Sequence, residues 1–229
     1  MLKVYKGCRN GMVVTLEIDS KGQNNMKRSG VVDPNHAVYR CQSARVVGIE
    51  HALTGETAEK AISDFDGQFC YRVGEMVEEP EYNTNIERVC DKGIHFYLTK
   101  ETAVFHALDL MNYVGYTGEF KCWHANGQRR EHGCYKDGKL DGEWETWYGD
   151  GQRLKHEWYN DGELNGELET WHDNGDVGNM DVTRMGKGTE NGRSGMRMAK
   201  VRFMDGTRMG KWEECDENGQ CHKSEWKNG

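Results

Sequence analysis

Proline and long apolar runs are scarce in this sequence, and basic residues are fewer than acidic ones. Two prolines among 229 residues exclude a proline-rich linker or a collagen-like chain. No segment approaches the ~18 consecutive apolar residues of a membrane-spanning helix. The first residues lack the apolar core of a secretory signal, so we expect neither secretion nor membrane insertion. Because 38 acidic residues outnumber 30 basic ones, the net charge of −8 disfavours nucleic acid and anionic membranes as partners of the whole chain.

Cysteine is also too sparse and too irregularly spaced for a disulfide scaffold. The eight cysteines therefore predict free thiols in a reducing compartment. Cys215 and Cys221 bracket Asn218-Gly219, and a two-residue turn there would leave them one residue out of register. We accordingly expect no disulfide between them.

Composition changes near residue 115. All seven tryptophans lie from Trp123 onward, and 20 of the 29 glycines lie from Gly115 onward. We therefore predict two domains, 1–114 and 115–229. The first is expected to be α+β, with a helix over 99–111 that has Thr99 as its N-cap and Glu101 in its first turn. Its strands are expected near 2–6, 11–18, 45–50, 69–78 and 94–98.

The second domain repeats with a period of 24 residues. A motif of glycine, any residue and then Phe, Trp or Leu starts at Gly118, Gly142 and Gly166, and it returns at Gly210 after a 20-residue insertion. The expected repeats are 118–141, 142–165, 166–209 with the insertion, and 210–229. Asn-Gly and Asp-Gly between short aromatic runs predict type I′ hairpins.

A single hairpin is marginal in water, so neighbouring repeats must share one core. This predicts an all-β array of hairpins, either a solenoid or an elongated rolled sheet. The residues expected in the repeat core are Phe120, Trp123, Tyr135, Trp144, Trp147, Tyr159, Leu168, Trp171 and Phe203.

The repeat, Gly-x-aromatic-x-x-Trp-x-x-[Asp/Asn]-Gly followed by aromatic-x-Asp-Gly-x-Leu, resembles the MORN repeat in its bacterial variant form. That resemblance implies β-hairpins that mediate assembly or partner contact. Three fragments of the first domain resemble an uncharacterised domain frequent in giant amoebal viruses: Tyr39-Arg-Cys41, Phe69-Cys-Tyr71-Arg-Val-Gly-Glu75, and Cys90-Asp-Lys-Gly-Ile-His95-Phe. The pairing implies a protein of the Marseillevirus-like group, located in the virion or the host cytoplasm.

Two cysteine–histidine groups could carry chemistry. Cys90 and His95 could form a nucleophile–base pair, and Cys41, Cys70, Cys90 and His95 are candidate metal ligands. Without a Cys-x-x-Cys pair the zinc signal is weak, and we favour structural cysteines and a hydrogen-bonded histidine. The alternative function is an enzyme or a metal or small-molecule binding module that uses Cys90, His95 and Arg72, with the repeats as a docking arm.

A second group comprises Cys122, His124, His132 and Cys134. A two-residue turn at Asn126-Gly127 would put His132 on the opposite face from Cys122 and His124, so these four side chains could not share a metal. No nucleotide-binding or hydrolase motif is present, and we expect no cofactor.

Charge is unevenly distributed along the repeats. Residues 142–177 carry a net charge of −8, and residues 184–211 carry +6. Uneven solvated faces would explain this, as would complementary contact between copies. Contact with nucleic acid through 184–211 is a third explanation, but the six methionines in and near this segment favour an adaptable apolar contact.

We expect a non-catalytic scaffold that forms a homodimer through its C-terminal repeats or binds other virion proteins, and we expect neither nucleic acid nor membrane as a partner. The candidate partner-binding residues are Trp226, Trp212, Arg184, Lys187, Arg193, Arg197 and Arg202.

Overall fold

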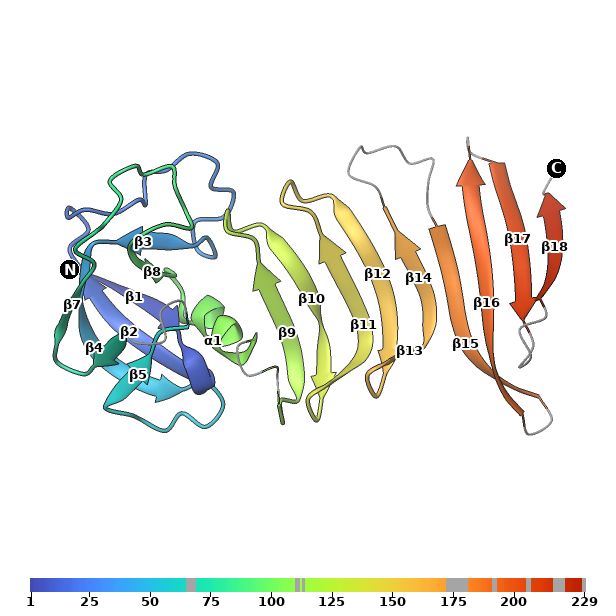
Figure 1. Ribbon diagram of the computed structural model, residues 1–229, viewed down its shortest axis with the longest axis horizontal. Coiled ribbons are helices and arrows are strands. Elements are labelled where there is room, and N and C mark those ends of the chain that lie inside the picture. Colours follow the sequence, from blue (N-terminus) through green and yellow to red (C-terminus); the bar gives the residue numbers. More distant parts are fainter. Residues whose placement is uncertain are drawn as a thin grey trace. The chain divides into compact units, whose positions relative to one another are not determined.

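The computed structural model is mostly β, with several antiparallel sheets (Figure 1). It divides into two compact units, Met1–Tyr116 with Lys121–Arg129, and Thr117–Phe120 with Arg130–Gly229. The described residues are 1–64, 69–109, 112, 114–171, 181–190, 193–204, 207–215 and 221–227; side chains are described as far as residue 171, except at 166–168.

The first unit is built around a four-stranded antiparallel sheet. Its order is β1 (Leu2–Gly7), β2 (Met12–Ile18), β4 (Ser43–His51) and β7 (Met76–Glu78). Two short antiparallel pairs accompany it: β3 (Tyr39–Cys41) with β8 (Ile94–Phe96), and β5 (Lys60–Ile62) with β6 (Cys70–Arg72). A 3₁₀ turn, η1 (Arg9–Gly11), links β1 to β2, and one helix, α1 (Lys100–Asp109), follows β8.

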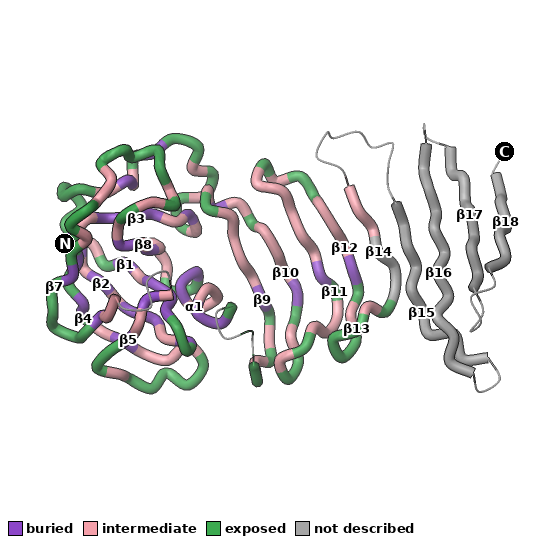
Figure 2. The backbone as a smooth tube through the Cα atoms, in the orientation of Figure 1, coloured by how far each residue is buried: buried purple, intermediate pink, exposed green. Residues whose placement is uncertain are grey.

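Strand β2 is apolar on both faces because each face covers a separate cluster. Val14, Leu16 and Ile18 alternate into the main core, whereas Val13 packs with Ala103 and Ala107 of α1. The helix lies close to β1 at Gly7, where a Cβ would be 2.7 Å from the Ala103 carbonyl oxygen. Figure 2 shows how the buried residues concentrate on these central strands.

The sequence-based assignments in this unit are partly correct. A helix with Glu101 in its first turn is confirmed, and the Thr99 hydroxyl that precedes it hydrogen-bonds the Thr102 hydroxyl at 2.8 Å. The single strand expected over 69–78 is wrong, since β6 and β7 are separate strands. Gly74 has a φ of +88° between them, and its N–H donates to the Val46 carbonyl. The three-residue strands β3 and β5 were not predicted, because each is too short to show a period.

The repeat region forms one antiparallel sheet whose neighbours follow the chain order, β9-β10-β11-β12-β14-β15-β16-β17-β18, with β13 paired to β12 (Figure 1). The first strands are β9 (Gly118–Trp123), β10 (Arg129–Lys136), β11 (Lys139–Trp147), β12 (Arg153–Asn160), β13 (Glu163–Leu164) and β14 (Gly166–Thr170). The last are β15 (Asp181–Glu190), β16 (Arg193–Met204), β17 (Thr207–Cys215) and β18 (Cys221–Lys227).

Type I′ turns occur at two of the Asp-Gly pairs, as predicted for them. Asp137 and Gly138 both have positive φ, as do Asp161 and Gly162, and each pair closes a two-residue loop. The two-residue turn expected at Asn126-Gly127 is wrong. The His124 N–H donates to the Gln128 carbonyl, which leaves a three-residue loop whose Gly127 alone has positive φ.

The Asn126 side chain explains that difference, because its Oδ1 accepts the Gln128 N–H at 3.0 Å. Asp150 does the same for Gln152 at 2.9 Å one repeat later. A further register expectation is corrected at the last hairpin, where Cys215 and Cys221 are direct register partners rather than offset by one residue.

The repeat core is best defined around Trp144. Its indole stacks on Phe120 with ring centroids 5.1 Å apart, and Tyr135 meets both rings edge-on at 5.7 Å. Gly133 lies under the indole, where a Cβ would be 2.2 Å from Cε3. The described chain therefore contains one closely packed aromatic group in the first two repeats.

The remaining predicted core residues differ in their placement. Trp147, Tyr159 and Trp171 are half-buried. Trp123 packs within the first unit, stacked on His36 with centroids 4.4 Å apart and 6.0 Å from Phe105. The side chains of Leu168 and Phe203 lie outside the described residues.

Candidate functional site

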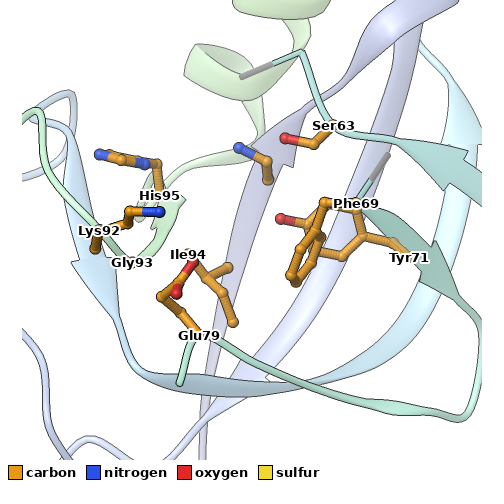
Figure 3. Close-up of a pocket in the computed structure, with 9 residues that line it drawn as sticks. Ser63, Phe69, Tyr71, Glu79, Lys92, Gly93, Ile94 and His95 are labelled. Carbon is orange, nitrogen blue, oxygen red and sulfur yellow. The ribbon is translucent and has the colours of Figure 1, made fainter. Parts of the chain in front are cut away.

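A small polar cavity lies in the first unit (Figure 3). Its volume is about 60 Å³. Strand β1 contributes Lys6, β8 contributes Ile94 and His95, and the β5–β6 hairpin contributes Ser63, Phe69 and Tyr71. The cavity therefore lies where three pairs of strands meet. The polar lining residues are Lys6, Ser63, Tyr71, Glu79, Lys92 and His95.

Lys6 is the most unusual of them, because only 5% of this lysine is exposed. Its Nζ lies 3.7 Å from Asp64 Oδ1, and Asp64 Oδ2 lies 3.7 Å from His106 Nε2. Burial raises the pKa of Tyr71 well above its usual value, and a hydrogen bond with the Ser63 side chain opposes that rise. These groups form a buried polar network beside the apolar core.

His95 is held in its neutral form. Its Nε2 donates a hydrogen bond to the Val89 carbonyl at 2.9 Å. Burial, and secondarily the positive charge of Lys6, lowers its pKa. The hydrogen-bonded histidine favoured from the sequence is thus the role that the contacts of this side chain support.

The cysteines predicted beside it are dispersed. Cys41 is buried in β3, Cys70 is half-buried in β6, and Cys90 is exposed and does not line the cavity. Within the described part of the chain, no group of three or more His, Cys, Asp or Glu side chains is placed to hold a metal ion. Arg72 is exposed at the end of β6, outside the cavity lining.

Thiol reactivity should follow this burial. Burial raises the pKa of both Cys8 and Cys41 to about 12, so less than about one part in a thousand of either thiol is ionised at pH 8. In timed iodoacetamide labelling of the folded protein, read by peptide mass spectrometry, we expect Cys90 and Cys134 to react first. Cys8 and Cys41 should react only in urea. Labelling of Cys41 as fast as Cys90 without denaturant would contradict the buried placement.

Sequence reasoning missed the most heavily bonded side chain near the cavity. Arg40 is fully buried in β3, and its guanidinium lies over the Tyr82 ring at 4.8 Å from the centroid. It donates to four main-chain carbonyls of one loop, those of Asn83, Asn85, Arg88 and Lys92. The only signal in the sequence was an arginine between two apolar residues, which does not distinguish a buried side chain from an exposed one.

The repeat sheet carries a second regular polar feature. His132 on β10 lies 2.9 Å from Glu119 Oε1 and 3.8 Å from Glu145 Oε2. One period later, His156 on β12 lies 2.8 Å from Glu143 and 3.5 Å from Glu169. Each histidine therefore bridges carboxylates of the two flanking strands, which contributes to strand registration.

The predicted partner-binding residues all fall in the last four strands. Their backbones lie in β15, β16, β17 and β18, and their side chains lie outside the described residues; they are Trp226, Trp212, Arg184, Lys187, Arg193, Arg197 and Arg202. Trp158 is the one large aromatic side chain among the described residues that is counted as exposed, at 44%.

Comparison with known proteins gives one match, which lies within the first unit. Residues 1–103 match the sequence profile of a family of unknown function, DUF5758. No curated protein and no solved structure matches the chain. In the described part of the chain, no helix combines the length and the apolar character that crossing a membrane requires.

Proposed function

We propose that this protein is a non-catalytic scaffold whose repeat region is a MORN-type array that joins two copies of the chain. The resemblances in the sequence suggest the virion of a giant virus, or the host cytoplasm, as its location. The observation that carries the proposal is the sheet order. Apart from β13, which pairs with β12 beside the path, the strands from β9 onward follow the chain order across the sheet, and β18 is the last of the described strands.

An edge strand is a ready template for another strand. Among the described residues β18 pairs with β17 on one side alone, so we take the main-chain N–H and C=O groups of its other side as available to a partner. It spans seven residues, enough for a regular intermolecular ladder. A second copy of the same strand is the occupant that we propose.

The sequence of β18 suits antiparallel pairing with itself. A ladder centred on Ser224 would place Lys223 of one copy opposite Glu225 of the other, and His222 opposite Trp226. Opposite charges and aromatic pairs across strands each contribute roughly 0.2–1 kcal/mol. Every such pair occurs twice about the two-fold axis, which is the arrangement of an isologous dimer.

Two proline variants test this edge. Adjacent N–H groups of a strand point to opposite sides, so of Ser224→Pro and Glu225→Pro one removes a donor to β17 and the other a donor to the free edge. We expect the variant that removes the donor at the free edge to convert the dimer into a monomer, while the far-ultraviolet circular dichroism of the protein is retained. The other variant serves as its matched control. Dimers of unchanged affinity for both variants would rule out pairing through β18.

A further inference from the structure

We propose that the cavity of the first unit binds inorganic phosphate through the Lys6 ammonium. The proposal concerns the first unit alone and is independent of dimer formation by the repeats. It rests on a buried cation, the size of the cavity and the mixture of donors and acceptors on its wall.

Among the described residues, the buried cation lacks a full set of partners. An ammonium group carries three donors. Among the described residues, Lys6 has one ion-pair contact, to Asp64 at 3.7 Å, which is beyond hydrogen-bond distance. Burying a charge with so few hydrogen bonds is costly, and an anion in the cavity would supply the missing acceptors.

Size limits the anion. A water molecule needs about 10–15 Å³ of such space, so 60 Å³ accommodates about four to six non-hydrogen atoms. Phosphate has five. Whole nucleotides, sugars and peptides are too large to be enclosed in this volume.

The polarity of the wall selects among small anions. Lys6 and Lys92 provide positive charge. The Ser63 and Tyr71 hydroxyls, from the residues labelled in Figure 3, can donate or accept. Glu79 lines the same cavity and accepts only. Hydrogen phosphate suits this mixture because its hydroxyl can donate to Glu79 while its other oxygens accept from Lys6. Sulfate and acetate carry no such donor at neutral pH.

The test uses the full chain and measures binding by equilibrium dialysis with radiolabelled phosphate, alongside the thermal midpoint. In buffers of equal ionic strength, about 20 mM phosphate should raise the midpoint above its value in chloride, and sulfate and acetate should raise it less. A phosphate midpoint equal to that in chloride, with no bound label, would overturn the proposal.

Lys6→Met should reduce phosphate affinity at least tenfold. Lys3→Met, an exposed substitution on the same strand, should leave it unchanged. If Lys6→Met does not fold, Ser63→Ala takes its place as the test variant. We expect Ser63→Ala to cause a smaller but measurable loss of phosphate affinity. Unchanged binding by a folded Lys6→Met, or by Ser63→Ala where Lys6→Met does not fold, would contradict the assignment.

Discussion

Replacing Arg40 by lysine is expected to lower the free energy of unfolding by about 3–4 kcal/mol. Lysine retains the charge but loses the planar fork of donors. The guanidinium donates to carbonyls of Asn83, Asn85, Arg88 and Lys92, and an ammonium on a different stem cannot reach all four. The carbonyls left without a donor, together with a less well bonded buried cation, account for the expected loss.

Urea denaturation followed by circular dichroism measures this effect. Arg45→Lys is the matched control, because Arg45 is exposed on β4 and donates to a single carbonyl, that of Gly74, at 3.2 Å. We expect the control to change stability by less than about 0.5 kcal/mol. Equal effects of the two substitutions would show that the buried guanidinium does not organise the loop over residues 82–93.

Gly127→Ala is expected to lower the free energy of unfolding by about 3 kcal/mol or more. A Cβ on Gly127 would lie 2.0 Å from the main-chain oxygen of Asp33. This turn is held by main-chain hydrogen bonds, from the Val32 N–H to the Asn126 carbonyl at 2.8 Å and from the Val38 N–H to the Ala125 carbonyl at 3.1 Å. The added methyl group must therefore separate the turn from residues 32–38.

Gly74→Ala is the control for Gly127→Ala, because it changes a glycine of the same φ that has no close neighbour. Gly74 has a φ of +88°, against +87° at Gly127, but a Cβ there would meet nothing within 4 Å. Gly74→Ala should lower the free energy of unfolding by only about 1–2 kcal/mol, the cost of placing alanine in the left-handed region. Hydrogen exchange gives a second readout, since the Val32 and Val38 amides should lose protection in Gly127→Ala alone. Equal urea midpoints for the two variants, with both amides protected, would contradict the close approach.

Local sequence patterns predicted the features that depend on neighbouring residues. The type I′ turns at Asp137-Gly138 and Asp161-Gly162 follow from the φ that each pair adopts. The helix followed from Thr99, Glu101 and its apolar stripe. Aromatic residues 24 apart, Phe120 and Trp144, are in contact, as a shared core requires.

Local sequence patterns could not predict the features that depend on contacts between distant parts of the chain. Trp123 fits the repeat motif, yet it stacks on His36, 87 residues earlier, because the turn after β9 packs on residues 32–38. Burial of Arg40 depends on the loop over residues 82–93, whose carbonyls its guanidinium binds. The candidate cavity draws its lining from separate strands, and no spacing in the sequence joins them.

The predicted Cys90–His95 pair shows that closeness in sequence does not establish a shared site. Cys90 and His95 are close in sequence, but the structure exposes the thiol and turns the Nε2 of the imidazole to the Val89 carbonyl. Lys6, which was not among the predicted site residues, is the buried charge that distinguishes the cavity. Sequence proximity was therefore a weaker guide to this site than the burial of a charged group.

Sedimentation velocity of this chain over a wide concentration range tests the proposed scaffold most directly. Pairing of two copies through β18 predicts a species of about twice the 26.3 kDa chain mass that dissociates on dilution. A single species of the chain mass at every concentration would contradict self-association through the repeat sheet.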